Sequence, residues 1–210
     1  MRAALDLGTR PVVGTFGFLL PHKGTFELVE AIDDLRSEFP DILLLALCAG
    51  YPNQESRDYE AGIRQAIVDR GMEQNVLLVT EYLPDDTART MLRASDAIVL
   101  PYQATGESSS ASIRFVLPMG RAVVVTDQPI FDDARDAVEV AETADHVGIS
   151  RSLGRVLRDD VLRSDLAGRA ERWSEQFRWE RVLARHQEIY AAAARAGTAR
   201  ARLVPLTTGS

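Results

Sequence analysis

The fold is decided by residues 12–48, which read VVGTFGFLLPHKGTFELVEAIDDLRSEFPDILLLALC. The first five residues predict a short strand, and residues 17–23 predict a loop that contains glycine. Apolar side chains then recur with helical period from residue 25 to 39, with Thr25 as the expected N-cap and Pro40 as the stop. Residues 42–48 are continuously apolar, as expected of a strand that is buried on both faces.

The alternation of strands and helices continues beyond this stretch. Further strands are expected at 75–80, 97–100, 122–126 and 138–140, and helices at 57–70, 84–94 and 109–117. Three more helices are expected at 152–157, 162–177 and 179–196. This pattern predicts an α/β fold with a Rossmann-like, doubly wound parallel sheet of five to six strands. We expect one domain over residues 1–196, of which 151–196 form a helical C-terminal segment, followed by a flexible tail at 197–210.

Composition narrows the class of protein. The 210 residues carry a formal net charge of −7, which argues against nucleic acid as the main partner. Cys48 is the only cysteine, so no intrachain disulfide and no cysteine-based zinc site can form, and we expect a reducing, cytoplasmic setting. No apolar stretch approaches the roughly 20 residues of a membrane helix, and no secretory signal pattern is present. The three histidines share no metal-ligand spacing, so no metal is expected.

Two loops that follow expected strands carry unusual chemistry. The first contains Gly17, Lys23 and Gly24, and Lys23 is the only lysine in a chain that otherwise uses arginine. A lysine at a helix start is easier to rationalise if an anionic ligand sits there, although an ordinary exposed lysine fits the local pattern as well. The loop matches neither the dinucleotide-binding G-x-G-x-x-G pattern nor the P-loop.

The second loop spans residues 102–114 and reads YQATGESSSASIR. Its serines could cap a helix and face a phosphate, Glu107 could accept hydrogen bonds from sugar hydroxyls, and Arg114 could reach a phosphate. A capped helix with a solvated glutamate and a surface ion pair is the alternative. The acidic loop 127–133 follows another strand, but its carboxylates are more typical of a solvated surface.

In their order and spacing these loops resemble the C-terminal donor-binding domain of GT-B glycosyltransferases, in particular the retaining family 4 (glycosyl transferases group 1). The first family motif, G-R-x-x-x-x-K-G, corresponds to residues 17–24, which read GFLLPHKG. The second motif corresponds to Pro101-Tyr102 and Glu107, followed by the stretch MGRAVV at 119–124. The stretch FRWE at 177–180, with Tyr190, is similar to the family's last long helix, so the likeness spans residues 10–192.

The resemblance implies one half of a GT-B fold that binds a nucleotide-diphosphate sugar for a retaining glycosyltransferase. It implies that Lys23 binds the donor diphosphate and Glu107 the donor sugar, which makes these two the expected catalytic residues. The other expected donor-binding residues are Gly17, Phe18, Tyr102, Ser108, Ser109, Ser110 and Arg114. No cofactor and no metal are implied. The acceptor-binding N-terminal domain would be missing from this chain, so we expect an isolated half that is inactive alone.

Two departures from the family pattern bear on the donor. Phe18 stands where the family has a phosphate-binding arginine, and Phe115 stands where a second glutamate holds the nucleotide ribose. Arg114 could supply the missing positive charge. These changes leave two alternatives open, a noncatalytic nucleotide-sugar-binding or scaffolding module with the same half-fold, and one half of a GT-B-like epimerase.

Overall fold

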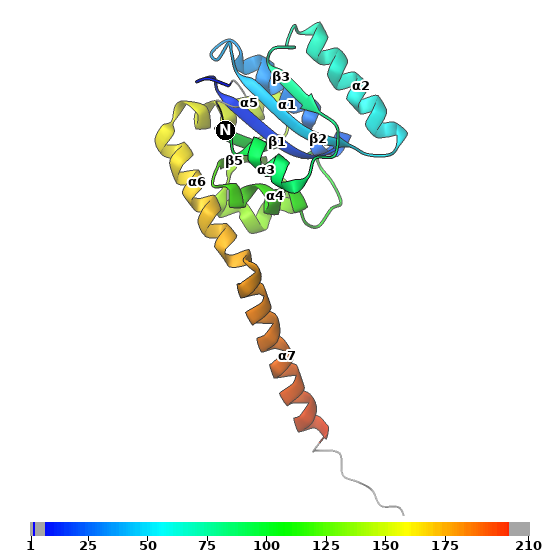
Figure 1. Cartoon of the computed structure of the whole chain (residues 1–210), viewed down its shortest axis with the longest axis vertical. Coiled ribbons are helices and arrows are strands. Elements are labelled where there is room, and N and C mark those ends of the chain that lie inside the picture. The colour runs from blue at the N-terminus through cyan, green and yellow to red at the C-terminus, as the bar shows by residue number, and fades with distance from the viewer. Residues whose placement is uncertain (1, 3–6, 202–210) are drawn as a thin grey trace, which may run out of the picture. The chain divides into compact units, whose positions relative to one another are not determined.

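The structure is a computed structural model that describes residue 2 and residues 7–201, with side chains up to residue 195. It divides into two compact units, one that ends at Trp173 and one that starts at Ser174. The first unit contains the sheet (Figure 1). The second contains the short 3-10 helix η5 (Glu175–Phe177) and the long helix α7 (Trp179–Ala201). The last helix was expected to end near residue 196 and instead runs to Ala201, whereas residues 202–210 of the expected tail lie outside the described residues.

The part of the chain that the structure describes forms one six-stranded, fully parallel sheet. The strand order is β3-β2-β1-β4-β5-β6, which confirms the predicted doubly wound sheet. Its strands are β1 (Val12–Leu19), β2 (Leu43–Gly50), β3 (Val76–Val79), β4 (Ala97–Leu100), β5 (Ala122–Thr126) and β6 (Glu139–Ala141). The chain moves outward from β1 to β3 and then returns to β4, on the other side of β1. Ligands of such sheets bind beyond the carboxyl ends of the strands at this switch point.

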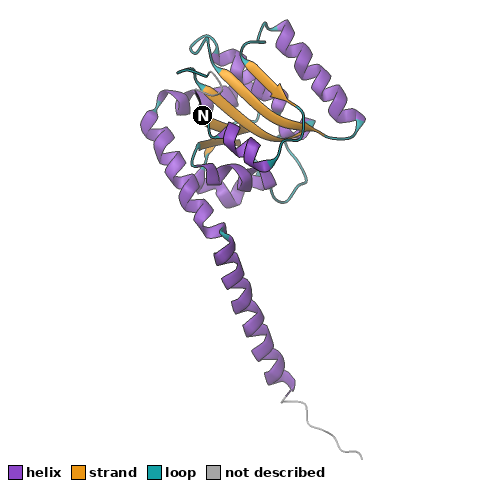
Figure 2. Ribbon diagram, viewed as in Figure 1, coloured by secondary structure: helices purple, strands orange, loops and turns teal. Residues whose placement is uncertain are grey.

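Helices cover both faces of the sheet (Figure 2). One face packs against α1 (Thr25–Leu35), α2 (Gln54–Asp69) and α5 (His146–Arg158). The other packs against α3 (Asp85–Leu92), α4 (Ala111–Val116) and the 3-10 helices η3 (Leu117–Met119) and η4 (Pro129–Ala137). Helix α6 (Asp160–Ser174) gives Leu166 to the first core and Trp173 to the second.

The run of apolar residues in β2 is divided between these two cores, as a strand buried on both faces requires. Leu45 and Leu47 belong to one core and Leu44 and Cys48 to the other. Burial raises the pKa of the Cys48 thiol to about 12. Cys48 is therefore a small buried hydrophobe, as predicted, because its thiolate is not formed at neutral pH.

Local structure differs from the prediction at several element ends. Helix α1, which was expected to reach residue 39 with Pro40 as its stop, ends at Leu35 with Arg36 as its C-cap. Strand β1 extends to Leu19 because its last residues pair with β2 up to Gly50, so the expected loop is shorter. Thr25 is not the N-cap of α1, since Gly24 takes that position and the Thr25 hydroxyl is buried 3.8 Å from the Cys48 sulfur. The helix expected at 152–157 begins six residues earlier, because the Asp145 side chain accepts a hydrogen bond from the amide of Gly148 and caps it.

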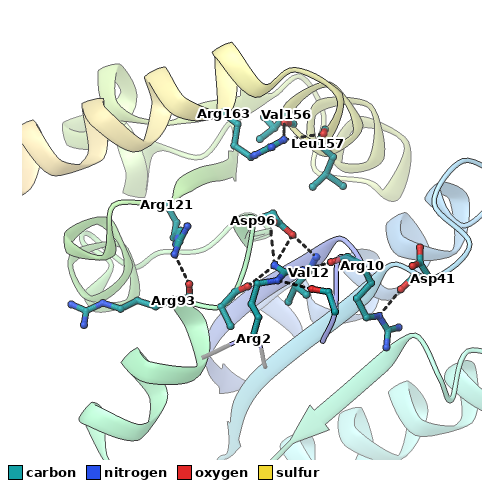
Figure 3. A network of polar contacts seen from close by, with 12 residues as sticks. Arg2, Arg10, Val12, Asp41, Arg93, Asp96, Arg121, Val156, Leu157 and Arg163 are labelled. Atoms are coloured by element: carbon teal, nitrogen blue, oxygen red, sulfur yellow. Dashed lines mark hydrogen bonds and ion pairs between the residues drawn. The ribbon is translucent and has the colours of Figure 1, made fainter. Parts of the chain in front are cut away.

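Arginine side chains hold together the edge of the sheet where the strands begin (Figure 3). Arg2 donates to the Ala94 carbonyl and to the carboxylate of Asp96, which in turn accepts from the Val12 amide at the start of β1. Arg10 donates to the Asp41 carbonyl at 2.7 Å, just before β2. These guanidinium groups satisfy backbone carbonyls of loops, which is a structural role.

Candidate functional site

A cavity of about 590 Å³ opens at the carboxyl ends of β1, β2 and β4, beside the loop that follows β3. Its position at the switch point of the sheet is the one expected for a ligand site. The residues that line it are Phe16, Gly17, Phe18, Leu20, Lys23, Leu47, Ala49, Tyr51, Glu81, Tyr82, Leu83, Asp85, Tyr102, Glu107, Ser109, Ser110, Ala111, Ser112 and Phe115.

Close packing between the loops after β1 and β4 positions Lys23. The 3-10 helix η2 (Pro21–Lys23) leads into Gly24, whose φ of 71° is left-handed. A Cβ atom on Gly24 would lie 1.8 Å from the carbonyl oxygen of Pro101, so only glycine allows this approach. The amide of Gln103 donates to the His22 carbonyl at 2.9 Å. The two loops that sequence analysis singled out therefore pack against each other and form one wall of the cavity.

The centre of this wall is an ion pair between the two loops. The Nζ atom of Lys23 lies 2.6 Å from Oε2 of Glu107 and 4.1 Å from the centroid of the Tyr102 ring. His22 Nε2 lies 3.3 Å from the other carboxylate oxygen of Glu107. The hydrogen bond from Lys23 holds the pKa of Glu107 below its usual value. Lys23 is thus a largely buried cation that pairs with the partly exposed carboxylate of Glu107.

Hydrogen bonds fix the ring under Lys23. The Ser110 hydroxyl donates to the Tyr102 hydroxyl at 3.3 Å and accepts from the amide of Ile113, which caps α4. Thr126 at the end of β5 donates to the Tyr102 carbonyl at 2.5 Å. By contrast, within the described residues, the hydroxyls of Ser109 and Ser112 have no hydrogen-bond partner and remain able to donate to a ligand.

Aromatic side chains form the rest of the cavity wall. Phe16 of β1 and Phe115 of α4 stack in parallel, with ring centroids 4.2 Å apart. Phe18 meets Tyr51, which follows β2, edge to face at 5.4 Å. The two positions where this chain departs from the family pattern, Phe18 and Phe115, therefore both lie in the cavity wall.

The structure brings together seven of the nine expected site residues. Ser108 and Arg114 are not among the residues that line the cavity. Arg114 instead forms a 2.5 Å ion pair with Asp133 and lies over the Trp173 ring. Asp127, in the acidic loop after β5, pairs with Arg135 on the surface, which holds the pKa of this carboxyl below its usual value.

Among the cavity residues that sequence analysis did not predict for the site are four polar or aromatic ones in the loops after β2 and β3, namely Tyr51, Glu81, Tyr82 and Asp85. All follow the carboxyl ends of β2 or β3, which is the signal that could have found them. Within the described residues, no group of three His, Cys, Asp or Glu side chains is arranged to hold a metal ion. None of the described helices has the length and apolar character needed to cross a membrane.

Comparison with known proteins places these features in a family. The family model for glycosyl transferases group 1 matches residues 10–159. A phosphatidyl-myo-inositol mannosyltransferase from Mycolicibacterium smegmatis is 26% identical over 180 residues, which cover 84% of this chain and 44% of the relative. The chain thus spans less than half the length of the curated relatives it matches.

Solved structures show the same fold. A sucrose-phosphate synthase from Thermosynechococcus elongatus superposes with a TM-score of 0.77 at 17% identity, over 93% of this chain and 48% of that one. The Anabaena protein HepE, solved in complex with UDP, superposes with a TM-score of 0.77 at 18% identity, over 92% of this chain and 51% of that one. The fold is therefore one half of the GT-B architecture, and the chain belongs to the group 1 glycosyltransferases.

Proposed function

We propose that this chain binds the donor of a retaining glycosyltransferase, a nucleotide-diphosphate sugar, in the cavity beside Lys23. The observation that carries this proposal is the largely buried Lys23 ammonium, which lines the cavity and pairs with the partly exposed carboxylate of Glu107. The two serine hydroxyls without partners lie in the same wall. A diphosphate matches this set, because it offers several acceptor oxygens to one fixed cation and several donors.

The proposed roles follow from the chemistry of each group. Lys23 leaves Glu107 and binds the diphosphate, where it stabilises the negative charge that develops on the leaving group. Glu107, once released, accepts hydrogen bonds from hydroxyls of the donor sugar. Ser109 and Ser112 donate to phosphate oxygens. Fixed cations and donors of this kind can carry the leaving-group charge without a metal or cofactor.

The comparisons support the donor class. HepE was solved with UDP, and the mycobacterial relative is named as a mannosyltransferase. The chain spans less than half of that relative. We therefore propose that a second domain supplies the acceptor site, and that the chain alone binds the donor but does not transfer its sugar.

Calorimetric titration with UDP and UDP-glucose tests this proposal. The loss of a charge-assisted contact in Lys23→Ala should weaken binding by about 10- to 100-fold. Arg135→Ala is the matched control, because it also removes one positive charge but from the surface pair with Asp127. If wild-type protein binds neither compound, or if both variants behave alike, the proposed donor site is wrong.

The second candidate is a noncatalytic module that binds a nucleotide sugar without transferring it. It is favoured by Phe18 and Phe115, which replace a cation and an acceptor of the family pattern inside the cavity wall. An experiment that combines the chain with the N-terminal domain of a related enzyme distinguishes the two functions. Sugar transfer that is lost in Lys23→Ala supports the enzyme, and tight donor binding without transfer supports the module.

A further inference from the structure

The carboxylate of Glu107 has two polar neighbours, one for each of its oxygens. Oε2 lies 2.6 Å from the Nζ atom of Lys23, and Oε1 lies 3.3 Å from Nε2 of His22. The His22 ring is partly exposed, but its Nε2 atom is buried, and within the described residues this atom has its polar contact with Glu107 alone. His22 is not among the residues that line the cavity, so it can act on a ligand there only through Glu107.

Backbone hydrogen bonds fix the position of His22 but not that of Glu107. His22 lies in the 3-10 helix η2, and its carbonyl accepts from the amide of Gln103 at 2.9 Å. By contrast, residues 104–108 make no backbone–backbone hydrogen bond within the described part of the chain, and the amide of Glu107 donates to the Thr105 hydroxyl at 3.3 Å. The loop that carries Glu107 therefore depends on side-chain contacts to hold the carboxylate in place.

Under the proposed function, binding of a diphosphate removes one of these two contacts. Lys23 moves to the phosphate oxygens, and Oε2 of Glu107 becomes free to accept a hydrogen bond from a sugar hydroxyl. An exposed glutamate without a fixed contact populates several rotamers, and ordering it costs free energy that donor binding would have to supply. The second contact, at Oε1, limits this cost if it persists in the complex.

The His22 ring can keep this contact after Lys23 has moved. Nε2 carries a proton both in one neutral tautomer and in the charged ring, so it can donate to a carboxylate in either state. Contacts of this kind are often long in a ligand-free site and shorten in the complex, which fits the 3.3 Å separation. We infer that His22 is a positioning residue that holds Oε1 of Glu107, so that Oε2 faces the donor sugar. The inference rests on the proposed function and adds to it a residue outside the cavity wall.

Calorimetric titration of the whole chain with UDP and with UDP-glucose tests this role, because only UDP-glucose carries a sugar for Glu107 to contact. His22→Asn and His22→Gln form a matched pair of variants. The glutamine amide can place an N–H group where Nε2 stands, whereas the shorter asparagine reaches only the position of Nδ1. His22→Asn should weaken the binding of UDP-glucose about three- to tenfold and leave that of UDP within about twofold of the wild type. His22→Gln should keep most of the affinity for UDP-glucose.

Equal losses for UDP and UDP-glucose in His22→Asn, or no loss for either, overturn the inference, and so does a His22→Gln variant that behaves like His22→Asn. If the variants do not fold, nitrogen NMR of the wild-type protein decides. Nε2 of His22 should then carry a proton with UDP-glucose bound, and a bare Nε2 in the complex contradicts the assigned role. If the wild-type protein binds neither compound, or if Lys23→Ala leaves both affinities unchanged, the proposed function itself fails, which is a different result.

Discussion

Glu107→Gln tests whether the Glu107 carboxylate forms an ion pair with Lys23 that a ligand must break. The substitution keeps the size of the side chain but removes the charge that lies 2.6 Å from the Lys23 Nζ atom. The Lys23 side chain is 13% exposed, but that of Glu107 is 43% exposed, so solvent screens the pair and its strength is about 0.5–1 kcal/mol. A diphosphate that binds Lys23 must break this ion pair. Loss of the ion pair in Glu107→Gln should therefore tighten UDP binding about two- to fivefold.

Titration calorimetry with UDP and UDP-glucose provides the assay. In the Glu107→Gln variant UDP should gain affinity, whereas UDP-glucose should gain less because the contact between Glu107 and the sugar is weakened. The gain should shrink as salt is raised, since the pair is partly exposed. Glu81→Gln is the matched control, because it removes the same charge from another cavity residue, in the loop that follows β3. An equal or weaker affinity of Glu107→Gln for UDP at low salt would refute the competition between carboxylate and diphosphate.

The pH dependence of this gain follows from the pKa of Glu107, which Lys23 holds below its usual value of 4.5. The carboxylate is ionised in the free protein throughout the neutral range. The ratio of the two UDP affinities, variant to wild type, should therefore be constant between about pH 5.5 and 8. It should approach one only where the carboxyl of the wild type becomes protonated, below the ordinary carboxyl range.

Two further predictions concern stability. Gly24→Ala should destabilise the fold by more than about 1 kcal/mol, because the new Cβ atom would meet the Pro101 carbonyl at a left-handed φ, and thermal unfolding measures this loss. The hydrogen bond to Asp34 raises the pKa of His146 above 6.5, so the pair stabilises the protein below that pH and this contribution is lost as pH rises through the raised value. Asp34→Asn should consequently lower the melting temperature more at pH 5.5 than at pH 8.5, and an equal effect at both pH values would contradict this reasoning.

The sheet could be predicted from sequence because its signals are local. The apolar run in β2 and the helical period after Lys23 depend only on neighbouring residues, and both are confirmed. The element ends were less accurate, since they depend on single side chains. Asp145, for example, starts α5 by accepting a hydrogen bond from one amide, and nothing in the apolar pattern shows that it does so.

The position of the site could be predicted from sequence only through the residues that follow the ends of the expected strands. Glu107 and Lys23 are 84 positions apart, and the switch in strand order brings them into contact. The direction of a side chain on a helix was beyond sequence reasoning. Arg114 was expected to reach a phosphate, but it pairs with Asp133, whereas the next residue, Phe115, lines the cavity. Consecutive side chains of a helix point in directions about 100° apart, so Arg114 and Phe115 do not face the same partner.

The choice of lysine at position 23, in a chain that otherwise uses arginine, has a physical reason in this geometry. An arginine would meet a carboxylate through two parallel hydrogen bonds, and such a pair resists exchange. An ammonium is a compact point charge that can pass from one oxygen to another by a small rotation. Under the proposed mechanism Lys23 must leave Glu107 for a diphosphate, and the centroid of the Tyr102 ring lies 4.1 Å from its Nζ atom. Lysine therefore suits a site whose cation has to change partners better than arginine does, although this chain otherwise uses arginine.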